Sequence, residues 1–315
     1  MRILVTGGAG FIGSHLVGKL LQRGDEVVCL DNFNDFYDPA IKRQNVSEFA
    51  DSSLFTLMEG DILDVAFLDE VFQNSFDVVV HLAAYAGVRP SIENPALYQR
   101  VNIEGTLNLL ECCKKNNVDR LVFASSSSVY GGRKEVPFRE TDNVMHPISP
   151  YAATKAAGEV LCHTYHHLYG ISVHALRFFT VYGPKQRPEM AIHLFASQML
   201  EDRPVKIYGD VLSSRDYTYI TDIIDGLTAS IDRCSGFEVI NLGGSATTTL
   251  GDLVQMIGAG LGVTPKTEQL PAQPGDVPIT FADVSKAAKL LDYAPKVPIE
   301  KGIGLFCDWM RQRIS

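Results

Sequence analysis

Tyr151 and Lys155 stand four positions apart in the segment "YAATK" at 151–155, early in a stretch with helical patterning. Residues i and i+4 share one face of a helix, so the phenol and the ammonium group would lie side by side. A neighbouring positive charge lowers the pKa of a phenol from its reference value of about 10. The pair could therefore remove a proton from a substrate hydroxyl near neutral pH. The same spacing arises by chance in many helices, so this interpretation needs support from other motifs.

A run of hydroxyl side chains, "SSSSVY" at 125–130, follows the apolar segment "RLVFA" at 120–124. The run contains no Asp or Glu. Hydroxyl groups can hold a sugar oxygen or a carboxylate, but they cannot act as carboxylate acids or bases near pH 7. If 120–124 is a parallel strand, the serines stand at its carboxyl end, where open α/β sheets bind their ligands. This position favours substrate binding over a plain polar loop.

The segment "TGGAGFIG" at 6–13 has the pattern of a nucleotide-binding turn between a strand and a helix. Its glycines allow a tight turn and a close approach of the backbone to a pyrophosphate at the helix N-terminus. The residues that we expect to contact a dinucleotide here are Gly7, Gly10, Phe11, Ile12 and Gly13.

Two acidic residues follow later strand-like runs. Asp31 could accept hydrogen bonds from the ribose diol of an adenosine and would repel a 2′-phosphate. No Arg follows Asp31 directly, so the sequence favours NAD over NADP. Asp61, in "GDI" at 60–62, could lie near the adenine or could be an ordinary turn residue.

These motifs lie on a regular alternation of short apolar runs and helical patterns. The strand-like runs are "RILVT" 2–6, "EVVCL" 26–30, "LFTLM" 54–58, "DVVVHL" 77–82, "RLVFA" 120–124 and "SVHALRF" 172–178. The clearest helical patterns cover 11–23, 94–116 and 148–169. Such alternation predicts an α/β fold, a doubly wound parallel Rossmann sheet with helices on both faces.

The distribution of turn-forming residues changes after residue 180, where Gly and Pro cluster and long irregular connections begin. We therefore predict an NAD-binding Rossmann domain over 1–179, with returning segments near 211–245. A smaller, interleaved α/β substrate-binding cap would cover 180–315.

The composition narrows the classes of partner. The 315 residues include 28 Lys and Arg against 37 Asp and Glu, and a net charge of −9 disfavours nucleic acid and anionic membrane surfaces. The six cysteines show no Cys-x-x-Cys spacing, which indicates buried free thiols in a reducing compartment. No signal-like start or long apolar span is present, so we expect a cytoplasmic protein. His163, His166 and His167 lack an acidic companion, which favours a solvated helix face over a metal site.

The glycine turn, Asp31, "HLAA" at 81–84, Asn102, the serine run and "YAATK" together resemble the extended short-chain dehydrogenase/reductase family of NAD-dependent sugar-nucleotide epimerases and dehydratases. The resemblance covers nearly the whole chain. Within that family the chain is most similar to the UDP-glucuronate 4-epimerases. The segments that carry this similarity are "NDFYDPAIKRQN" 34–45, "AGVRPSIENP" 86–95, "RFFTVYGPKQRPEMA" 177–191, "YGDVLSSRDYTYITDI" 208–223 and "QPGDVPITFAD" 273–283.

The resemblance implies roles for particular residues. Tyr151 would be the catalytic base, Lys155 its electrostatic partner and a ribose contact, and Ser126 the hydroxyl on the sugar O4. Further NAD contacts would come from Asn32, Asp61, Ile62, Leu82, Ala83, Ala84 and Asn102. Contacts to a UDP-sugar would come from Arg89, Ser127, Ser128, Thr180, Arg187, Tyr208, Arg215 and Asp276. The resemblance also implies a homodimer formed by the helices at 94–116 and 148–169. We expect no metal site, as the histidines above indicate.

Three of these positions have more specific expectations. Arg215 would bind the pyrophosphate, and Tyr208 would stack on the uracil. Glu189 stands where many relatives have Asp, and we expect little consequence from that exchange.

In the family, the positions after Ser126 separate the reactions. The 4,6-dehydratases have an Asp–Glu pair there and the UDP-glucuronate decarboxylases a Glu, whereas this chain has Ser127 and Ser128. We therefore expect NAD-dependent 4-epimerisation of UDP-glucuronate to UDP-galacturonate through a transient 4-keto sugar. Arg187, Thr180 and the two serines would hold the sugar carboxylate. The alternatives are a 4-epimerase of neutral UDP-hexoses (UDP-glucose or UDP-N-acetylglucosamine), a UDP-glucuronate decarboxylase, and a non-catalytic NAD-binding regulatory protein.

Overall fold

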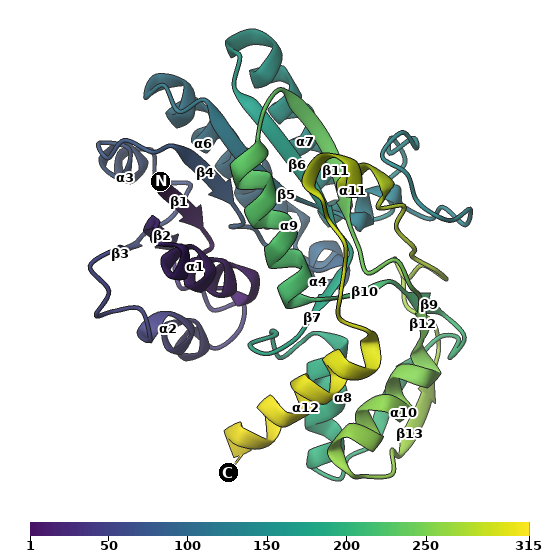
Figure 1. The fold of residues 1–315 in the computed structure, drawn as a ribbon. Helices are drawn as coiled ribbons and strands as arrows, with labels where there is room; N and C mark the ends of the chain where they lie inside the picture. The colour runs from purple at the N-terminus through teal and green to yellow at the C-terminus, as the bar shows by residue number, and fades with distance from the viewer. Residues whose placement is uncertain (315) are drawn as a thin grey trace.

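The computed structural model describes residues 1–314 and has a seven-stranded parallel sheet at its centre, in the order β11-β6-β5-β4-β1-β2-β3 (Figure 1). The α/β fold with a Rossmann-type parallel sheet is thus confirmed. The strands of the sheet are β1 Arg2–Thr6, β2 Glu26–Asp31, β3 Phe55–Glu59, β4 Val78–His81, β5 Arg120–Ser126, β6 Ser172–Phe178 and β11 Phe237–Leu242.

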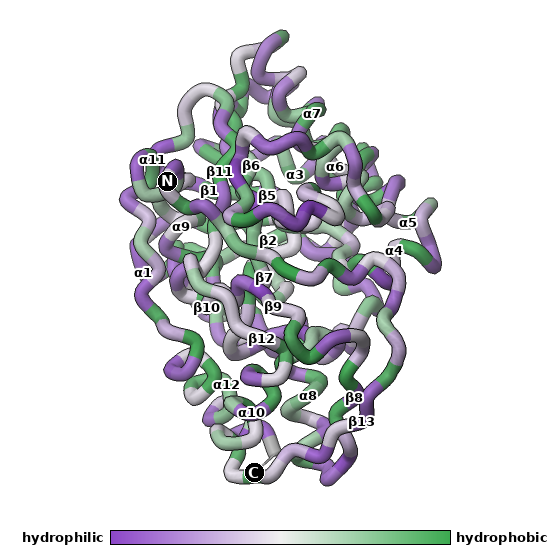
Figure 2. Tube along the Cα trace, turned by 90° about the vertical axis from the view of Figure 1, so that its right-hand side faces the viewer, coloured by the Kyte–Doolittle hydropathy of each residue, from purple (hydrophilic) through white to green (hydrophobic). Residues whose placement is uncertain are grey.

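Helices cover both faces of this sheet. Alternate side chains of a strand point to opposite faces, so Ile3 and Val5 enter one hydrophobic cluster while Leu4 enters another. The first cluster includes residues of α1 (Phe11–Arg23) and α9 (Ile220–Arg233). The second includes residues of α3 (Val65–Val71), α6 (Gly105–Lys115) and α7 (Pro150–Tyr169). Figure 2 shows the mixed polarity along α1 that a helix with one buried face requires.

The long helix expected over 94–116 differs in the structure. It divides into α5 Pro95–Gln99, a π-helical turn η1 Arg100–Glu104, and α6. At the junction, a side chain on Gly105 would collide with Ile62. The wider π turn coincides with this close packing, which no pattern of apolar residues reveals. The helix expected over 148–169 begins two residues later, at Pro150, because the Ser149 side chain caps it by accepting from the Ala152 amide.

The chain leaves the sheet after Phe178 and forms small two-stranded pairings. These are β7 Thr180–Tyr182 with β10 Tyr217–Tyr219, β8 Val205–Tyr208 with β13 Thr267–Leu270, and β9 Ser214–Arg215 with β12 Thr248–Thr249. Helices α8 Ala191–Leu200, α10 Leu250–Leu261 and α12 Ile299–Ile314 gather below the sheet (Figure 1). Within this part of the chain, α9 and β11 return to the sheet. The domain boundary at residue 179 stays a prediction.

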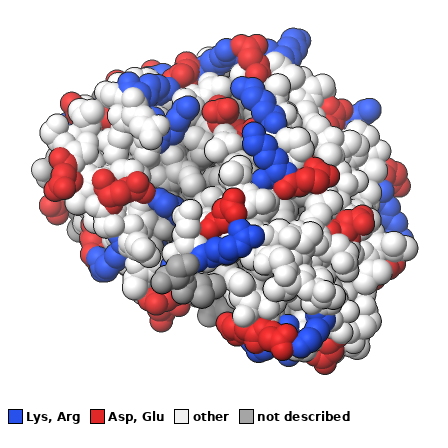
Figure 3. Space-filling view, turned by 60° about the horizontal axis from the view of Figure 1, so that its bottom comes forward, with Lys and Arg blue, Asp and Glu red and all other residues white. Residues whose placement is uncertain are grey.

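The remaining helices are short: α2 Pro39–Ser47, α4 Val88–Glu93, the 3-10 turn η2 Ser127–Tyr130, and α11 Ser285–Leu291. All six cysteines are buried and free, as predicted from their spacing. None of the helices in residues 1–314 is long and apolar enough to cross a membrane. On the face drawn in Figure 3, basic and acidic side chains stand beside one another.

Candidate active site

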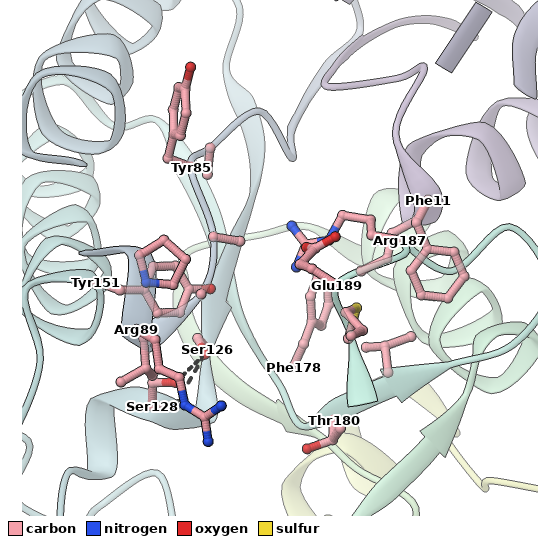
Figure 4. A pocket seen from close by; sticks show the side chains of 18 of the residues that line it. Phe11, Tyr85, Arg89, Ser126, Ser128, Tyr151, Phe178, Thr180, Arg187 and Glu189 are labelled. Carbon is pink, nitrogen blue, oxygen red and sulfur yellow. Dashed lines mark hydrogen bonds and ion pairs between the residues drawn. The ribbon is translucent and has the colours of Figure 1, made fainter. Parts of the chain in front are cut away.

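A cleft of about 940 Å³ lies at the carboxyl ends of the parallel strands, between the sheet and the segments that follow Phe178. Open α/β sheets bind ligands at this edge. The cleft is lined by every residue that we predicted for the site except Asn102. Figure 4 shows Tyr151 and Ser126 together on one side of the pocket, and Arg187 beside Glu189 on the other.

The glycine turn forms one end of the cleft. Gly7 has a φ of +67°, a left-handed conformation that favours glycine. A side chain on Gly13 would collide with the Gly7 carbonyl, so the turn and the start of α1 can touch only through glycine. Gly10 is the N-cap of α1 and offers no side chain to the first amides of the helix. Free amides at a helix N-terminus suit an anion, so this cradle fits the pyrophosphate of a dinucleotide.

Asp31 is held rigidly beside this cradle. Its Oδ2 accepts from the Ala9 amide at 3.2 Å and its Oδ1 from the Phe33 amide at 2.9 Å. Lys42 lies 3.6 Å from Asp31, and both side chains are buried. Burial lowers the pKa of Lys42, while Asp31 opposes that shift. Sequence reasoning missed Lys42, although it lies within the quoted segment 34–45, because its partner is fixed only by the fold of α2.

Asp61 continues the same wall, since it accepts from the Asn32 side-chain amide at 2.8 Å and from the Leu63 amide at 2.9 Å. Both residues line the cleft. The side chains of Asp31, Asn32 and Asp61 therefore form a continuous row of polar groups at the ends of β2 and β3.

Asn102 does not reach the cleft, contrary to our expectation of a cofactor contact. Its side chain is buried and pairs with both backbone groups of Tyr85 at 2.9 Å, and with Thr154 at 3.0 Å. Both the oxygen and the nitrogen of its side-chain amide are thus bonded within the protein. Asn102 thus fixes the loop after β4 to helix α7, and it supports the wall from behind.

Lys155 is fully buried in helix α7, and its Nζ donates to the Ala124 carbonyl at 2.7 Å. Burial lowers the pKa of Lys155 to about 8, against a smaller raising effect of Cys162 and Glu159. The pKa of Tyr151 is raised by burial, and the Ser126 side chain and the Arg187 charge oppose that shift. The lowered phenol pKa expected from the Lys155 spacing is therefore absent in the protein alone, because loss of solvent outweighs the favourable neighbours.

The four serines divide between two environments. Ser125 turns inward and donates to Glu159 of α7, which also pairs with Arg177 through two hydrogen bonds of 2.8 and 2.7 Å. Ser126 faces the cleft and accepts from the Ser128 amide, and its hydroxyl donates to the Ser128 hydroxyl at 3.1 Å. The buried Glu159–Arg177 pair under the serine run was not predicted, because α7 and β6 meet only in three dimensions.

Arg89 and Asp276 meet across the mouth of the cleft. Their ion pair is 3.1 Å long, and Arg89 also lies 4.9 Å from the centre of the Tyr208 ring. Arg215 donates to the Ser214 carbonyl at 3.0 Å. Burial lowers the pKa of Arg215, and no carboxylate of residues 1–314 lies within ion-pair distance of it. Arg215 therefore presents a largely unneutralised charge to the cleft, as an anion site requires.

Arg187, like Arg89, is an arginine of the cleft that has a carboxylate partner. Its Nε lies 3.0 Å from Glu189 Oε1, and its guanidinium lies 5.7 Å from the centre of the Phe36 ring. Thr180, at the start of β7, lines the same cleft (Figure 4). The described residues contain no group of three or more His, Cys, Asp or Glu side chains that could hold a metal ion.

These features define a dinucleotide-binding enzyme fold with a tyrosine–lysine pair at the cofactor cleft. The model of the NAD dependent epimerase/dehydratase family matches residues 3–243, and the chain belongs to that family.

Similar proteins cover nearly the whole chain. A UDP-glucuronate 4-epimerase of Thermodesulfobacterium geofontis is 44% identical over 314 residues, which are 99% of this chain and 97% of that protein. The crystal structure of a UDP-glucuronic acid 4-epimerase from Bacillus cereus, in complex with UDP-glucuronic acid and NAD, is 40% identical with a TM-score of 0.94, and covers 99% of this chain and 100% of that chain. A Thermus thermophilus UDP-glucose 4-epimerase in complex with NAD is 35% identical with a TM-score of 0.90, covering 99% of each chain.

Proposed function

We propose that this protein is a sugar-nucleotide isomerase that interconverts UDP-glucuronate and UDP-galacturonate at C4, with NAD bound in the cleft. The observation that carries the proposal is the cleft wall around Tyr151, where Ser127 and Ser128 stand in place of carboxylates and a guanidinium, Arg187, lies across the pocket. The similarity to proteins named UDP-glucuronate 4-epimerase supports the same substrate.

The cleft fits NAD at the glycine cradle and at the row of Asp31, Asn32 and Asp61, with Leu82, Ala83 and Ala84 following β4 on the other side of the cradle. The chemistry that bound NAD supplies is reversible hydride transfer at C4 of the sugar. Asp31 would accept bonds from the ribose diol, and its position is already fixed by two backbone amides.

The chain's own residues would handle the proton. Tyr151 would take the O4 proton as the sugar is oxidised and return it after the 4-keto sugar has turned over. Ser126 would hold O4, since its hydroxyl lies on the same side of the pocket as the phenol (Figure 4). Lys155 would stabilise the phenolate by its charge.

A glucuronate substrate requires control of its carboxylate. The 4-keto intermediate is a β-keto acid, which loses CO₂ when the bond to the carboxylate aligns with the carbonyl π system. Arg187, Thr180 and the hydroxyls of Ser127 and Ser128 all line the cleft and could hold the carboxylate out of that alignment. Charge-assisted hydrogen bonds of this kind stabilise by about 1.5–3 kcal/mol each.

One observation favours a second candidate, a 4-epimerase of neutral UDP-hexoses. Arg187 already has a carboxylate partner in Glu189, so a neutral sugar could bind without leaving a charge unpaired. A decarboxylase is disfavoured, because Ser127 and Ser128 provide no acid or base after Ser126. A non-catalytic protein would not need to bring Ser126, Tyr151 and Lys155 to one cleft.

We also propose a cytoplasmic homodimer with the two-domain division predicted above. Exposed apolar side chains on α6 and α7 support the dimer, namely Leu107, Val160 and Leu168, of which Val160 is 64% exposed. The six free thiols support a reducing compartment.

The experiment that tests the activity is NMR analysis of products with UDP-glucuronate, UDP-glucose and UDP-N-acetylglucosamine supplied in parallel. We expect conversion of UDP-glucuronate to its C4 epimer without net consumption of NAD, and slower conversion of the other two. Preferred conversion of a neutral sugar would establish the second candidate. Conversion of none, with NAD bound, would support the regulatory protein. Release of CO₂ as the main reaction would indicate a decarboxylase.

A further inference from the structure

We propose that Glu189 is a specificity-determining residue, which occupies Arg187 while the cleft is free of substrate and yields it to the carboxylate of an acidic sugar. The inference rests on the proposed function, in which Arg187 holds the substrate carboxylate. It adds a residue outside our predicted site, and it changes our expectation that Glu189 has little consequence.

The first support is geometric. Arg187 and Glu189 lie on the turn that precedes α8, where the Met190 amide donates to the Arg187 carbonyl at 3.1 Å. Their side chains face each other at 3.0 Å inside the cleft (Figure 4). Among residues 1–314, Glu189 is the only acidic residue within ion-pair distance of Arg187.

The second support comes from the neighbouring charges. Lys42, the other cation in this part of the cleft, is already paired with Asp31. The Arg187 charge lowers the pKa of the Tyr37 and Tyr151 phenols against the larger effect of burial, but neither phenol is an ion-pair partner of Arg187. A carboxylate that binds Arg187 therefore competes with Glu189 for this cation.

The third support is the exposure of the pair. The side chain of Arg187 is 21% exposed and that of Glu189 is 39% exposed, so the pair is screened by solvent and weak. A weak internal partner is easily displaced by a substrate whose carboxylate is positioned by several hydroxyls as well. A neutral sugar offers no anion to Arg187, so the Arg187–Glu189 ion pair remains formed when such a sugar binds.

The consequence is a specific effect on sugar selectivity. Removing the Glu189 charge should favour acidic sugars, because the competitor for Arg187 and the like charge near the substrate are both lost. It should not favour neutral sugars, since they make no use of the freed guanidinium. The expected gain is about two- to fivefold in the Kd ratio of UDP-glucose to UDP-glucuronate, the range that a partly exposed ion pair allows.

The test is isothermal titration of NAD-loaded Glu189→Gln with UDP-glucuronate and with UDP-glucose, in a Tyr151→Phe background so that the sugars are not turned over. The matched control is Glu26→Gln, which removes the same charge at the amino end of β2, opposite the cleft. We expect the Kd ratio to rise in Glu189→Gln and to stay unchanged in the control. In an Arg187→Ala background, Glu189→Gln should leave the ratio unchanged, because no cation remains to be released.

An unchanged or lower ratio in Glu189→Gln would overturn the inference, and so would an equal rise when Arg187 is already absent. A failure of the proposed function is distinguished from a failure of this inference, because the unmodified protein would then not epimerise UDP-glucuronate. If Glu189→Gln does not fold, Glu189→Lys in the same assay keeps a long polar side chain and should raise the ratio further.

Discussion

The two walls of the cleft are built differently. On the cofactor wall, the acceptors are fixed by the fold: Asp31 and Asp61 receive backbone amides and are held in place before any ligand arrives. On the sugar wall, two of the arginines are paired with carboxylates, Arg89 with Asp276 and Arg187 with Glu189. The first wall is preorganised, and the second can exchange an internal partner for a ligand. This difference suits one retained cofactor and a substrate that must leave in each cycle.

The largest expected effect is a loss of catalysis that leaves both walls of the cleft intact. Tyr151→Phe should reduce turnover by at least about a hundredfold, because general-base catalysis is lost with the hydroxyl. The fold and the retained NAD should be unaffected. Steady-state kinetics and the absorbance of the bound dinucleotide check this. Retention of more than a few per cent of activity would remove Tyr151 from the role of base.

The next effect breaks the cofactor wall. Gly13→Ala should cause loss of NAD and destabilise the fold by about 1–3 kcal/mol or more, since the new methyl group meets the Gly7 carbonyl. Gly304→Ala is the matched control, because Gly304 lies within helix α12 with no atom near its added methyl group. That change should stabilise by about 0.5–1 kcal/mol. Urea unfolding and dinucleotide content measure both. Equal effects at the two positions would show that the close approach is unimportant.

A smaller effect is expected on the sugar wall. Arg187→Ala should weaken UDP-glucuronate about ten- to a hundredfold and UDP-glucose much less, because only the acidic sugar loses an ionic partner. The freed carboxylate should also align more often with the 4-keto group, so that some turnovers release CO₂ and a UDP-4-keto-pentose. Titration and the ratio of epimer to CO₂ are the measurements. Normal binding and epimerisation by Arg187→Ala would contradict this role of Arg187 and make Arg89 the next candidate for holding the carboxylate.

The pH dependence of activity and of stability reports on Lys155. Because burial lowers the pKa of Lys155 to about 8, its ammonium group loses its charge above that pH. Activity should then fall by up to about tenfold per pH unit. For stability the sign is opposite. The folded pKa lies below the unfolded value, so the unfolded chain binds more protons between about pH 8 and 10.5, and the contribution of Lys155 to stability rises with pH over this window.

The control for this titration is Lys155→Arg, which keeps a cation throughout the range. Its residual activity should show no alkaline fall near pH 8. Lys155→Ala should lose most activity and shift its optimum upward, since the proposed stabilisation of the phenolate by the Lys155 charge is lost. An identical alkaline limb in the arginine variant would assign the titration to another group.

The smallest effect concerns the mouth of the cleft. Asp276→Asn should change the free energy of unfolding by less than about 1 kcal/mol, because the Arg89–Asp276 pair is largely exposed. The change should shrink further as ionic strength rises. Urea unfolding at two salt concentrations checks this. A loss of several kcal/mol would mean that the sugar wall is as fixed as the cofactor wall.

The sequence predicted those parts of the site that depend on short spacings. The turn at 6–13 and the Tyr151–Lys155 pair are local patterns, and the strand ends bring the serines and Asp31 to one edge. The structure was needed wherever two elements meet: Lys42 beside Asp31, Glu159 with Arg177, and the inward-facing Asn102. Spacing along the chain does not determine which side chain of one helix meets which residue of another element. The sequence likewise does not show that Glu189 contacts Arg187, on which our proposal for this residue rests.

The late return of β11 to the sheet has a consequence for biosynthesis. Strands β1 to β5 are complete by residue 126, and β6 by residue 178, but the partner that covers the outer edge of β6 emerges only with residues 237–242. A nascent chain therefore exposes an unpaired strand edge while nearly sixty further residues are synthesised. Such edges pair readily with other chains. A fragment ending near residue 235 therefore leaves β6 as the edge of the sheet, whereas a fragment that includes residues 237–242 pairs β6 and leaves β11 as the edge strand.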